Sequence, residues 1–497
     1  MREDTPSLFP NSERASPGTT LTLPPSKDGG PARLVTIFGS LSPHGARRVH
    51  YIFDAGEPAY TEIVLSANGP LRSIAREMPG AAWHERELHD QYGIEIVGHP
   101  DLRPLVFHDN WPDGVHPMID RVDDVPWSKR EYRFLQVQGE GIAEVAVGPV
   151  HAGIIEPGHF RFSVVGDTIL HLELRHFYTH KGTEKLFEGK SVENGTMLAE
   201  SVSGDNCFAH AVCYSQAVEN ACGIEVPPRA LAVRLMGLEF ERLVCHISDV
   251  GGLCTDVGFG VAAAYATRLK ESMLQASVQC CGTRYWRGVA VPGGLRFDLD
   301  SAKVTELAQA VERASRDFSE MARLILETPS IQNRFETAGI LSREAAQDLA
   351  AVGPVARASG IDLDVRRDHP YGGYGKHLIE VPVTHYGDVM ARARIRIAEA
   401  AVSAQLIQEA AKSLADGSVF TPVILQGDIQ GFSAVESPRG ELCYWIEAHG
   451  GRLTRCHIKS PSLQNWPAMP IAVAGNIIAD FPLINKSFNL SYSGCDR

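Results

Sequence analysis

The feature of the sequence that most limits the fold is a change of pattern beyond Phe134. Before it, short runs of β-branched and aromatic residues stand between turn residues, a pattern typical of strands, at 35–38, 48–53 and 62–65. After it, apolar residues recur at helical spacing over long segments. With 497 residues the chain is too long for a single ordinary core. We therefore predict a multidomain α+β protein, in which a small N-terminal α/β domain precedes a mainly α-helical domain with peripheral strands.

This change of pattern divides the chain into four segments. Residues 1–32 are rich in Pro, Gly and Ser and are expected to be disordered. Residues 33–120 are expected to form the small α/β domain, with a short helix over 71–78. Residues 121–137 are rich in proline and charge, which predicts a linker. Residues 138–497 are expected to form the mainly helical domain.

Several helices and strands of this second domain can be placed from residue spacing. Apolar residues three and four apart predict helices, and a glycine after the last periodic residue predicts a helix end. The predicted helices cover 231–238, 301–311 with Ser301 as the cap, and 389–414 with an end at Asp416-Gly417. The predicted strands cover 161–165, 169–174 and 441–447.

Composition argues against several classes of protein. The formal net charge of −13 argues against nucleic acid or an anionic lipid surface as the main partner. No apolar run reaches the roughly 18 residues that a membrane-spanning helix needs, and the N-terminal region lacks the apolar core of a signal peptide. None of the ten cysteines belongs to a Cys-x-x-Cys pair, so we expect buried, reduced thiols.

Two stretches resemble parts of respiratory complex I. The sequence from Trp83 to Arg103, WHERELHDQYGIEIVGHPDLR, is similar to the signature of the C subunit. Residues 147–497 resemble the D subunit and, more closely, the large subunit of membrane-bound nickel–iron hydrogenases. The order of the two parts matches the fused large subunits of the formate-hydrogenlyase or hydrogenase-4 type. The motifs of the second part are 148–161, 178–185, 217–220, 226–229, 241–249, 287–294, 369–371, 387–392 and 438–441.

The resemblance implies a metal site whose ligands are missing here. Such hydrogenases hold nickel and iron through four cysteines, two in an early Cys-Gly-x-Cys motif and two in a late Asp-Pro-Cys-x-x-Cys motif. A centre of this kind needs soft, anionic sulfur ligands. The corresponding positions are Ser203, Asn206, Ser491 and Gly494. We therefore expect that this chain binds no nickel and has no intrinsic hydrogenase activity.

Two cysteines, Cys207 and Cys495, lie one residue beyond a missing ligand. One residue turns a helix by about 100°, so we expect Cys207 to point away from the former metal pocket. A shifted metal site built from these two thiols is the alternative. Related hydrogenase precursors run on into a peptide that is trimmed after metal loading. The sequence ends at Arg497, where that cut would fall, and we expect no trimming.

The resemblance to complex I makes quinone an alternative ligand. In that family the D subunit binds quinone beside the terminal iron–sulfur cluster, using a tyrosine and a histidine. The tyrosine position aligns with Gly204, and the histidine position falls near residues 156–158. Neither quinone ligand is clearly present in the sequence.

The remaining acids and histidines suggest a proton relay. Glu156 matches a glutamate thought to pass protons toward the membrane arm in ion-pumping hydrogenases, and His151 and His159 flank it in the sequence. His246, Asp249 and Asp256 fall roughly along one stripe of a predicted helix, which suits a buried polar chain. The alternatives are a capping role for the glutamate and a solvated or ion-paired face for the helix.

Three arginines, Arg366, Arg392 and Arg396, are candidates for pairing with these acids or for facing the cavity or a partner's cluster. An arginine beside an iron–sulfur cluster would raise its reduction potential electrostatically. The resemblance places that 4Fe–4S cluster on a small partner protein rather than on this chain.

Together these features predict a peripheral subunit of a membrane-bound, complex-I-like or hydrogenase-related complex. It would shape an electron- and proton-coupling cavity next to the partner's 4Fe–4S cluster. The expected partners are the small iron–sulfur subunit and membrane ion-translocating subunits, which would hold the chain on the cytoplasmic face of the membrane. No Gly-x-Gly-x-x-Gly follows a predicted strand, so no direct NAD binding is expected. The alternatives are a quinone-reducing subunit, as in NADH:quinone oxidoreductase, and a catalytically silent assembly scaffold.

Overall fold

The computed structural model describes residues 13–15, 21–27, 29–120, 122, 127–129, 131–152 and 155–497. Its N-terminal part is built on a four-stranded sheet with the order β1-β4-β3-β2. Strand β3 is antiparallel to β2 and β4, and β1 is parallel to β4. These strands span Glu13–Ala15 (β1), Arg33–Leu41 (β2), Arg47–Asp54 (β3) and Thr61–Ser66 (β4), which confirms the three predicted strands.

The helix predicted over 71–78 is wrong. Residues Leu71–Arg72 form strand β5, which pairs with β6 at Ile96–Val97. The helix lies further along the chain, at Pro79–Ala81 (η1) and Ala82–Tyr92 (α1). The carboxylate of Glu85 on α1 accepts hydrogen bonds from the Ser73 hydroxyl and the Ile74 amide, which holds this segment in a turn. A left-handed Gly93 ends α1.

Part of the segment expected to be disordered is ordered against the N-terminal core. Leu21 and Leu23 pack on this core, Pro25 and Pro31 form an isolated bridge, and Ala32 is fully buried. The expectation of disorder up to residue 32 therefore needs correction, because these apolar side chains have a surface to cover. Residues 1–12, 16–20 and 28, and positions 121, 123–126 and 130 of the expected linker, lie outside the described residues.

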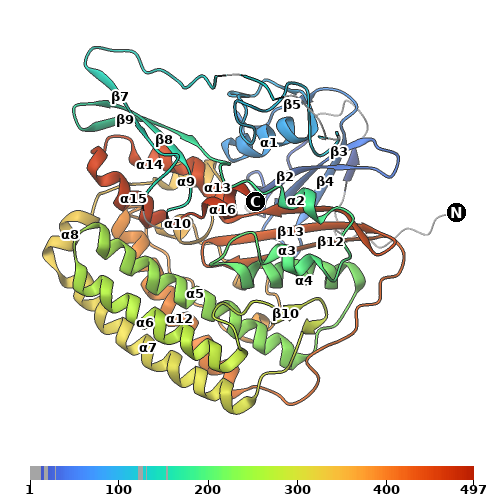
Figure 1. Cartoon of the computed structure of the whole chain (residues 1–497), viewed down its shortest axis with the longest axis vertical. Helices are drawn as coiled ribbons and strands as arrows, with labels where there is room; N and C mark the ends of the chain where they lie inside the picture. The colour runs from blue at the N-terminus through green and yellow to red at the C-terminus, as the bar shows by residue number, and fades with distance from the viewer. Residues whose placement is uncertain are drawn as a thin grey trace.

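The second part combines a helical bundle with two small sheets (Figure 1). Helices α5, α6, α7 and α12 pack side by side, and α4 covers the antiparallel sheet β12-β13-β14. A second antiparallel sheet, β7-β8-β9, stands at the edge of the molecule. The bounds are Ile142–Val147 (β7), His159–Val165 (β8), Thr168–Arg175 (β9), Cys207–Cys222 (α4), Pro228–Asp256 (α5), Gly260–Cys281 (α6), Ser301–Glu327 (α7), Val389–Lys412 (α12), Ile429–Ser437 (β12), Gly440–His449 (β13) and Arg452–Lys459 (β14).

The predicted helices and strands of this part are confirmed, with two corrections at helix ends. Asp300, one residue before the predicted cap Ser301, is the N-cap of α7, because its carboxylate accepts hydrogen bonds from the amides of Ala302 and Lys303. Helix α12 ends at Lys412 and does not extend to 414.

Short elements complete the chain and carry its C-terminal end back toward the N-terminal sheet (Figure 1). They are Thr183–Phe187 (α2), Gly195–Ala199 (α3), Ala290–Val291 (β10), Gly294–Leu295 (β11), Pro329–Phe335 (α8), Arg343–Asp348 (α9), Gly353–Ala358 (α10), Val365–Asp368 (α11), Tyr374–Lys376 (η2), Pro461–Asn465 (α13), Trp466–Ala468 (η3), Met469–Val473 (α14), Ile478–Asp480 (η4), Phe481–Phe488 (α15) and Tyr492–Asp496 (α16). No helix of the described part of the chain is long and apolar enough to cross a membrane.

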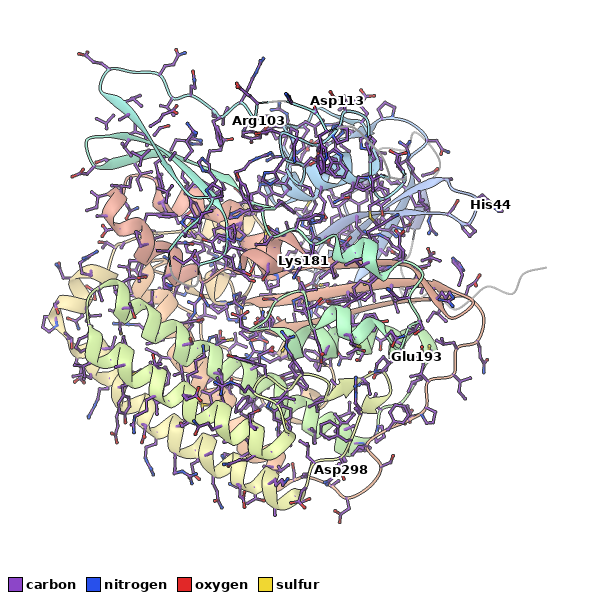
Figure 2. The ribbon with its side chains drawn as sticks, viewed as in Figure 1. His44, Arg103, Asp113, Lys181, Glu193 and Asp298 are labelled. Atoms are coloured by element: carbon purple, nitrogen blue, oxygen red, sulfur yellow. The ribbon has the colours of Figure 1, made fainter. Side chains whose placement is uncertain are left out.

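The two parts share a core. Val35 and Phe38 of β2 belong to the same buried cluster as Phe432 and Trp445 of the β12-β13-β14 sheet. Arg33 of β2 also pairs across the boundary with Glu441 of β13, at 2.8 Å. The C-terminal residue is part of this junction: the Arg497 guanidinium donates to the Glu87 carboxylate of α1 at 2.6 Å. The Arg497 carbonyl also accepts from the amide of Lys181, which lies near the centre of Figure 2. The predicted α+β fold class is thus confirmed.

Candidate functional site

The early and late motifs, far apart in sequence, meet in the folded chain. Ser203 and Asn206 lie just before α4, whereas Ser491 caps the C-terminal helix α16, which contains Gly494. The hydroxyl oxygens of Ser203 and Ser491 are 3.0 Å apart. The Gly494 amide donates to the Ser491 hydroxyl at 2.9 Å. The positions that correspond to hydrogenase ligands are therefore occupied by a hydrogen-bonded contact between two ends of the domain.

A guanidinium group joins the two motifs. Arg439, from the turn between β12 and β13, donates to the Asn206 amide oxygen at 3.0 Å and to the Asp205 carboxylate at 2.6 Å. It also donates to the Asn489 carbonyl. Although burial opposes ionisation, the Arg439 charge holds the pKa of Asp205 below its usual value. The positive charge between the two motifs is therefore the guanidinium group of Arg439.

The donor set does not fit a nickel–iron centre. Hydroxyl, amide and glycine positions replace all four thiolates, and soft transition metals of this kind need thiolate sulfur. The Cys207 thiol donates instead to the Tyr285 carbonyl at 3.1 Å, and burial raises the pKa of Cys207 and of Cys495. Across the described residues, no group of three or more His, Cys, Asp or Glu side chains is arranged to hold a metal ion.

Beside this contact lies a cavity of about 350 Å³ between α5, α6 and the C-terminal segment. Its polar side is formed largely by one face of α5, whose residues are spaced by three or four. Its apolar side is aromatic and aliphatic. Lys270 and Lys486, both partly exposed, also line it. The polar residues are Asp205, Glu241, Cys245, Ser248, Asp249 and Asn489, and the apolar residues include Phe240, Val244, Leu274, Tyr285 and Trp286.

Two members of the predicted relay lie together, and one reaches the cavity. Asp249 lines the cavity and pairs with Arg396 at 3.0 Å. His246 faces away from it, toward α12, where its Nε2 lies 2.8 Å from Glu399. The other ring nitrogen is 3.9 Å from Asp249. Asp256 lies apart from both, at the last turn of α5, where burial raises its pKa. The three predicted residues of α5 therefore do not form one continuous polar chain along the cavity.

The predicted glutamate approaches the site from another side. Glu156 lies on the loop between β7 and β8, and its carboxylate accepts from the Ser493 amide of α16 at 2.9 Å. His151 closes the same loop through the Gly158 carbonyl, at 2.7 Å. Residues 153 and 154 lie outside the described part of this loop. Glu156 thus caps the helix that carries two of the four former ligand positions.

Of the three predicted arginines, Arg396 pairs with Asp249, as one of the two alternatives had it, whereas Arg366 and Arg392 do not face the cavity. Arg366 is fully enclosed by Asp364 and Glu239, at 2.6 and 3.1 Å. Arg392 donates to the Gly387 and Gly339 carbonyls and to the Ser487 hydroxyl. The expectation for both residues needs correction, because the buried backbone and acidic groups around them already use their donors.

Several residues that build the site were missed at the level of sequence. Those on α5 could have been found by extending the helical stripe backward from Asp249, since residues 249, 245 and 241 repeat at spacings of four. The residues that come from other segments have no comparable signal, because they meet the helix only in three dimensions. The missed residues are Asp205, Glu241, Cys245, Arg439 and Asn489.

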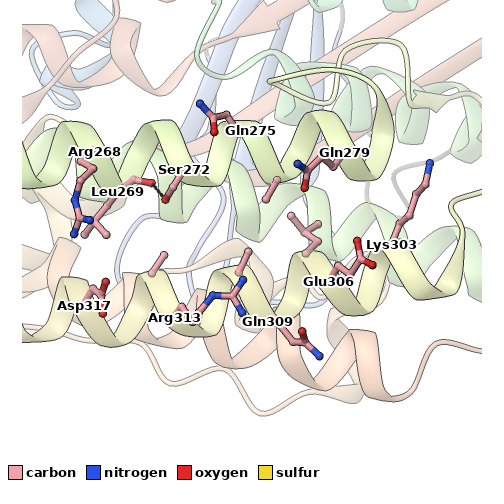
Figure 3. Close-up of a pocket in the computed structure, with 14 residues that line it drawn as sticks. Arg268, Leu269, Ser272, Gln275, Gln279, Lys303, Glu306, Gln309, Arg313 and Asp317 are labelled. Atoms are coloured by element: carbon pink, nitrogen blue, oxygen red, sulfur yellow. Dashed lines mark hydrogen bonds between the residues drawn. The ribbon is translucent and has the colours of Figure 1, made fainter.

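A larger hollow lies elsewhere. It is a groove of about 480 Å³ between α6 and α7, lined by polar side chains that include Arg268, Gln279, Glu306 and Asp317 (Figure 3). None of the residues predicted for the site lines it. We therefore base the functional argument on the smaller cavity, which adjoins the two motifs.

Comparison with known proteins places the chain in a family. The model of the respiratory-chain NADH dehydrogenase 30 kDa subunit matches residues 34–126, and that of the 49 kDa subunit matches 256–427 and 424–497. The chain is 34% identical to formate hydrogenlyase subunit 5 of Escherichia coli over 454 residues, which cover 88% of this chain and 78% of that protein. The chain belongs to the complex I 49 kDa/30 kDa family.

Other relatives of the family support this assignment. Hydrogenase-4 component G of Escherichia coli is 33% identical, over 93% of this chain and 80% of its own length. The fused C/D protein of the NADH-quinone oxidoreductase of Phocaeicola vulgatus is 27% identical, over 86% and 87%. A chain of the membrane-bound sulfane sulfur reductase, an archaeal respiratory membrane complex, shares the fold with a TM-score of 0.68, at 24% identity, over 72% of this chain and 99% of that one. As a family member, the chain is a subunit of a complex-I-like or hydrogenase-related oxidoreductase complex.

Proposed function

We propose that this subunit shapes a nickel-free cavity in which electron transfer is coupled to proton movement. The observation that carries the proposal is the contact between Ser203 and Ser491, with Arg439 bonded to both motifs. In this arrangement the polar groups at the former ligand positions hydrogen-bond to one another and to Arg439. The adjoining cavity of about 350 Å³ is left available to a small molecule. Acidic and basic side chains around that cavity supply groups that can take part in proton transfer.

The electrons would come from a partner's 4Fe–4S cluster, as in the related complexes. Partner docking is supported by the loop that carries Glu156, where Val150 is 84% exposed and Ile155 is 45% exposed. Apolar side chains this exposed, close together in sequence, are a feature of protein interfaces. The small iron–sulfur subunit would cover this loop. Membrane ion-translocating subunits would hold the assembly at the cytoplasmic face of the membrane.

The metal content of the intact complex tests this proposal. We expect a complex purified through a tag on a partner protein to contain iron but no stoichiometric nickel, because the thiolate ligands are absent. Formate hydrogenlyase, purified by the same procedure, serves as the nickel-containing control. One nickel per chain of this protein, together with hydrogen evolution, would overturn the proposal.

Quinone reduction is a second candidate, favoured by the apolar wall of the cavity. Phe240, Leu274 and Trp286 could cover a planar ring, and Asp249 lies on the polar side. A quinone-site inhibitor should then block turnover of the assembled complex and compete with a soluble quinone analogue. If the inhibitor has no effect at saturating concentration, quinone reduction is excluded and the acceptor is another small molecule.

A further inference from the structure

The acids that line the cavity differ in their partners. Asp205 pairs with Arg439 at 2.6 Å, and Asp249 pairs with Arg396 at 3.0 Å. Glu241, the third acid, forms no ion pair with any lysine or arginine in the described part of the chain. Its carboxylate oxygens instead accept from the backbone amides of Phe208 and Ala209, at 2.8 and 3.1 Å. Glu241 is therefore the acid whose charge no side chain cancels.

The surroundings of Glu241 favour its neutral form. It is only 6% exposed, on the helix face that lines the cavity. Burial raises the pKa of Glu241 to about 8, the two amide hydrogen bonds oppose this rise, Asp205 adds to it and Arg242 weakly opposes it. A carboxyl group with this pKa carries its proton at neutral pH and loses it at moderately alkaline pH. The other charged or titratable groups nearby are Cys207, Cys245, Asp249, Lys270, Tyr285 and Lys486.

We propose that Glu241 stores the proton that the cavity exchanges with its bound molecule. This inference rests on the proposed function and assigns the proton-holding residue within it. In the step, the Glu241 O–H bond breaks and the proton moves to a basic atom of a small molecule whose negative charge has grown through reduction by the partner's iron–sulfur cluster. The carboxylate that remains keeps its two backbone hydrogen bonds.

A path for reloading Glu241 follows the same helix face. Cys245 lies one turn further along α5, and Ser248 follows it. The Lys270 ammonium group, which is partly exposed, donates to the Ser248 hydroxyl at 3.2 Å. Water in the cavity can bridge these groups to the solvent, since the walls between them are polar. The proton would therefore return from the side of the cavity where Lys270 lies.

Infrared spectroscopy of the intact complex tests the proposal. The infrared spectrum of the wild-type complex minus that of the Glu241→Gln complex should contain the C=O band of a protonated carboxyl group at pH 6. This band should disappear as the pH rises, with a midpoint near pH 8. No such band, or a band that persists at pH 9.5, would overturn the proposal. Glu436→Gln is the matched control, because burial raises the pKa of Glu436 to about 7. The band lost in this variant should titrate at lower pH than the Glu241 band, and the spectrum of the variant itself should still contain the Glu241 band.

Asp205→Asn provides a second test that leaves Glu241 in place. Removing the Asp205 charge should move the midpoint of the Glu241 band to lower pH, and an unchanged midpoint contradicts the proposal. In turnover assays, Glu241→Gln should lower the rate about 10²-fold and abolish the pH dependence near 8. If the wild-type complex shows no electron transfer through this chain, the proposed function fails, whereas the infrared bands still test Glu241 separately.

Discussion

The side chains of Ser203 and Ser491 meet at 3.0 Å although 288 residues separate them in sequence. The contact joins the entry to α4 with the C-terminal helix α16. Ser491 has a second task, since its hydroxyl accepts from the Gly494 amide and caps α16. The two serines therefore differ in the kind of interaction that each substitution would remove, because only Ser491 caps a helix.

Alanine substitutions should reveal that difference. Ser203→Ala removes hydrogen bonds to Ser491 and Asp205 and should lower the free energy of unfolding by about 1 kcal/mol. Ser491→Ala also removes a helix cap and should cost roughly 2 kcal/mol. Urea unfolding of the single and double variants measures both values and their coupling. Additive effects would indicate that the hydroxyls do not interact in solution.

Arg439 should be more important for stability than either serine. Arg439→Met leaves the half-exposed Asp205 carboxylate, the buried Asn206 amide oxygen and the Asn489 carbonyl without their donor, at a cost of about 2–4 kcal/mol after allowing for solvent screening at Asp205. Arg334→Met, which breaks the partly exposed pair with Asp480, serves as the control and should cost less than about 1 kcal/mol. Adding Asp205→Asn to Arg439→Met should recover part of the loss. A further loss in that double variant would contradict the ion-pair account.

Stability should fall in acid because of Glu239. Arg242 and Arg366, against the opposing effect of burial, lower the pKa of Glu239 from 4.5 to about 2. A carboxyl group with a lowered pKa stabilises the fold above pH 4.5, and its contribution is lost as the pH falls toward 2. The loss should approach about 3 kcal/mol. Unfolding of wild type and Glu239→Gln between pH 7 and 2 measures it; an equally steep decline in the variant would assign the effect to other acids.

Replacing Glu156 separates a proton relay from a silent scaffold. Glu156→Gln keeps an oxygen that can accept from the Ser493 amide, so α16 should stay capped while the side chain can no longer carry a proton. If Glu156 is part of the relay, ion translocation by the assembled complex should fall about 10²-fold, with assembly unchanged. Glu144→Gln, on the same hairpin in an exposed pair with Arg161, is the control. Normal translocation in Glu156→Gln would favour the scaffold.

The sequence predicted elements better than it predicted contacts. Periodicity located α5, α7 and α12, because a long amphipathic pattern depends on local spacing. It misplaced the helix at 71–78, since Glu85 reaches back to hold that segment as a turn. It also could not foresee that the charge of Arg366 is cancelled by Asp364 and Glu239, because the pairing with Glu239 depends on how α5 and α11 pack.

The cavity was anticipated only in part, for the same reason. Asp249 was predicted on the correct helix, but its neighbours there were chosen from the wrong face. Glu241 lies two turns before it on the same side, whereas His246 turns toward Glu399. Asn489 and Arg439 come from distant segments, and no local spacing in the sequence shows that they meet at this site. The ligand positions were predictable because the family motifs carry their own spacing.

The core shared by the two parts has a consequence for synthesis. Strands β2 and β3 cover Phe432 and Trp445, yet about 360 residues separate the end of β4 at Ser66 from the start of β12 at Ile429. A ribosome working at roughly 5–20 residues per second needs on the order of 20–70 s to make that stretch. During this time the N-terminal sheet presents Val35, Phe38 and Ile52 to the solvent without their cover. The nascent chain should therefore be a strong chaperone client until its last quarter emerges.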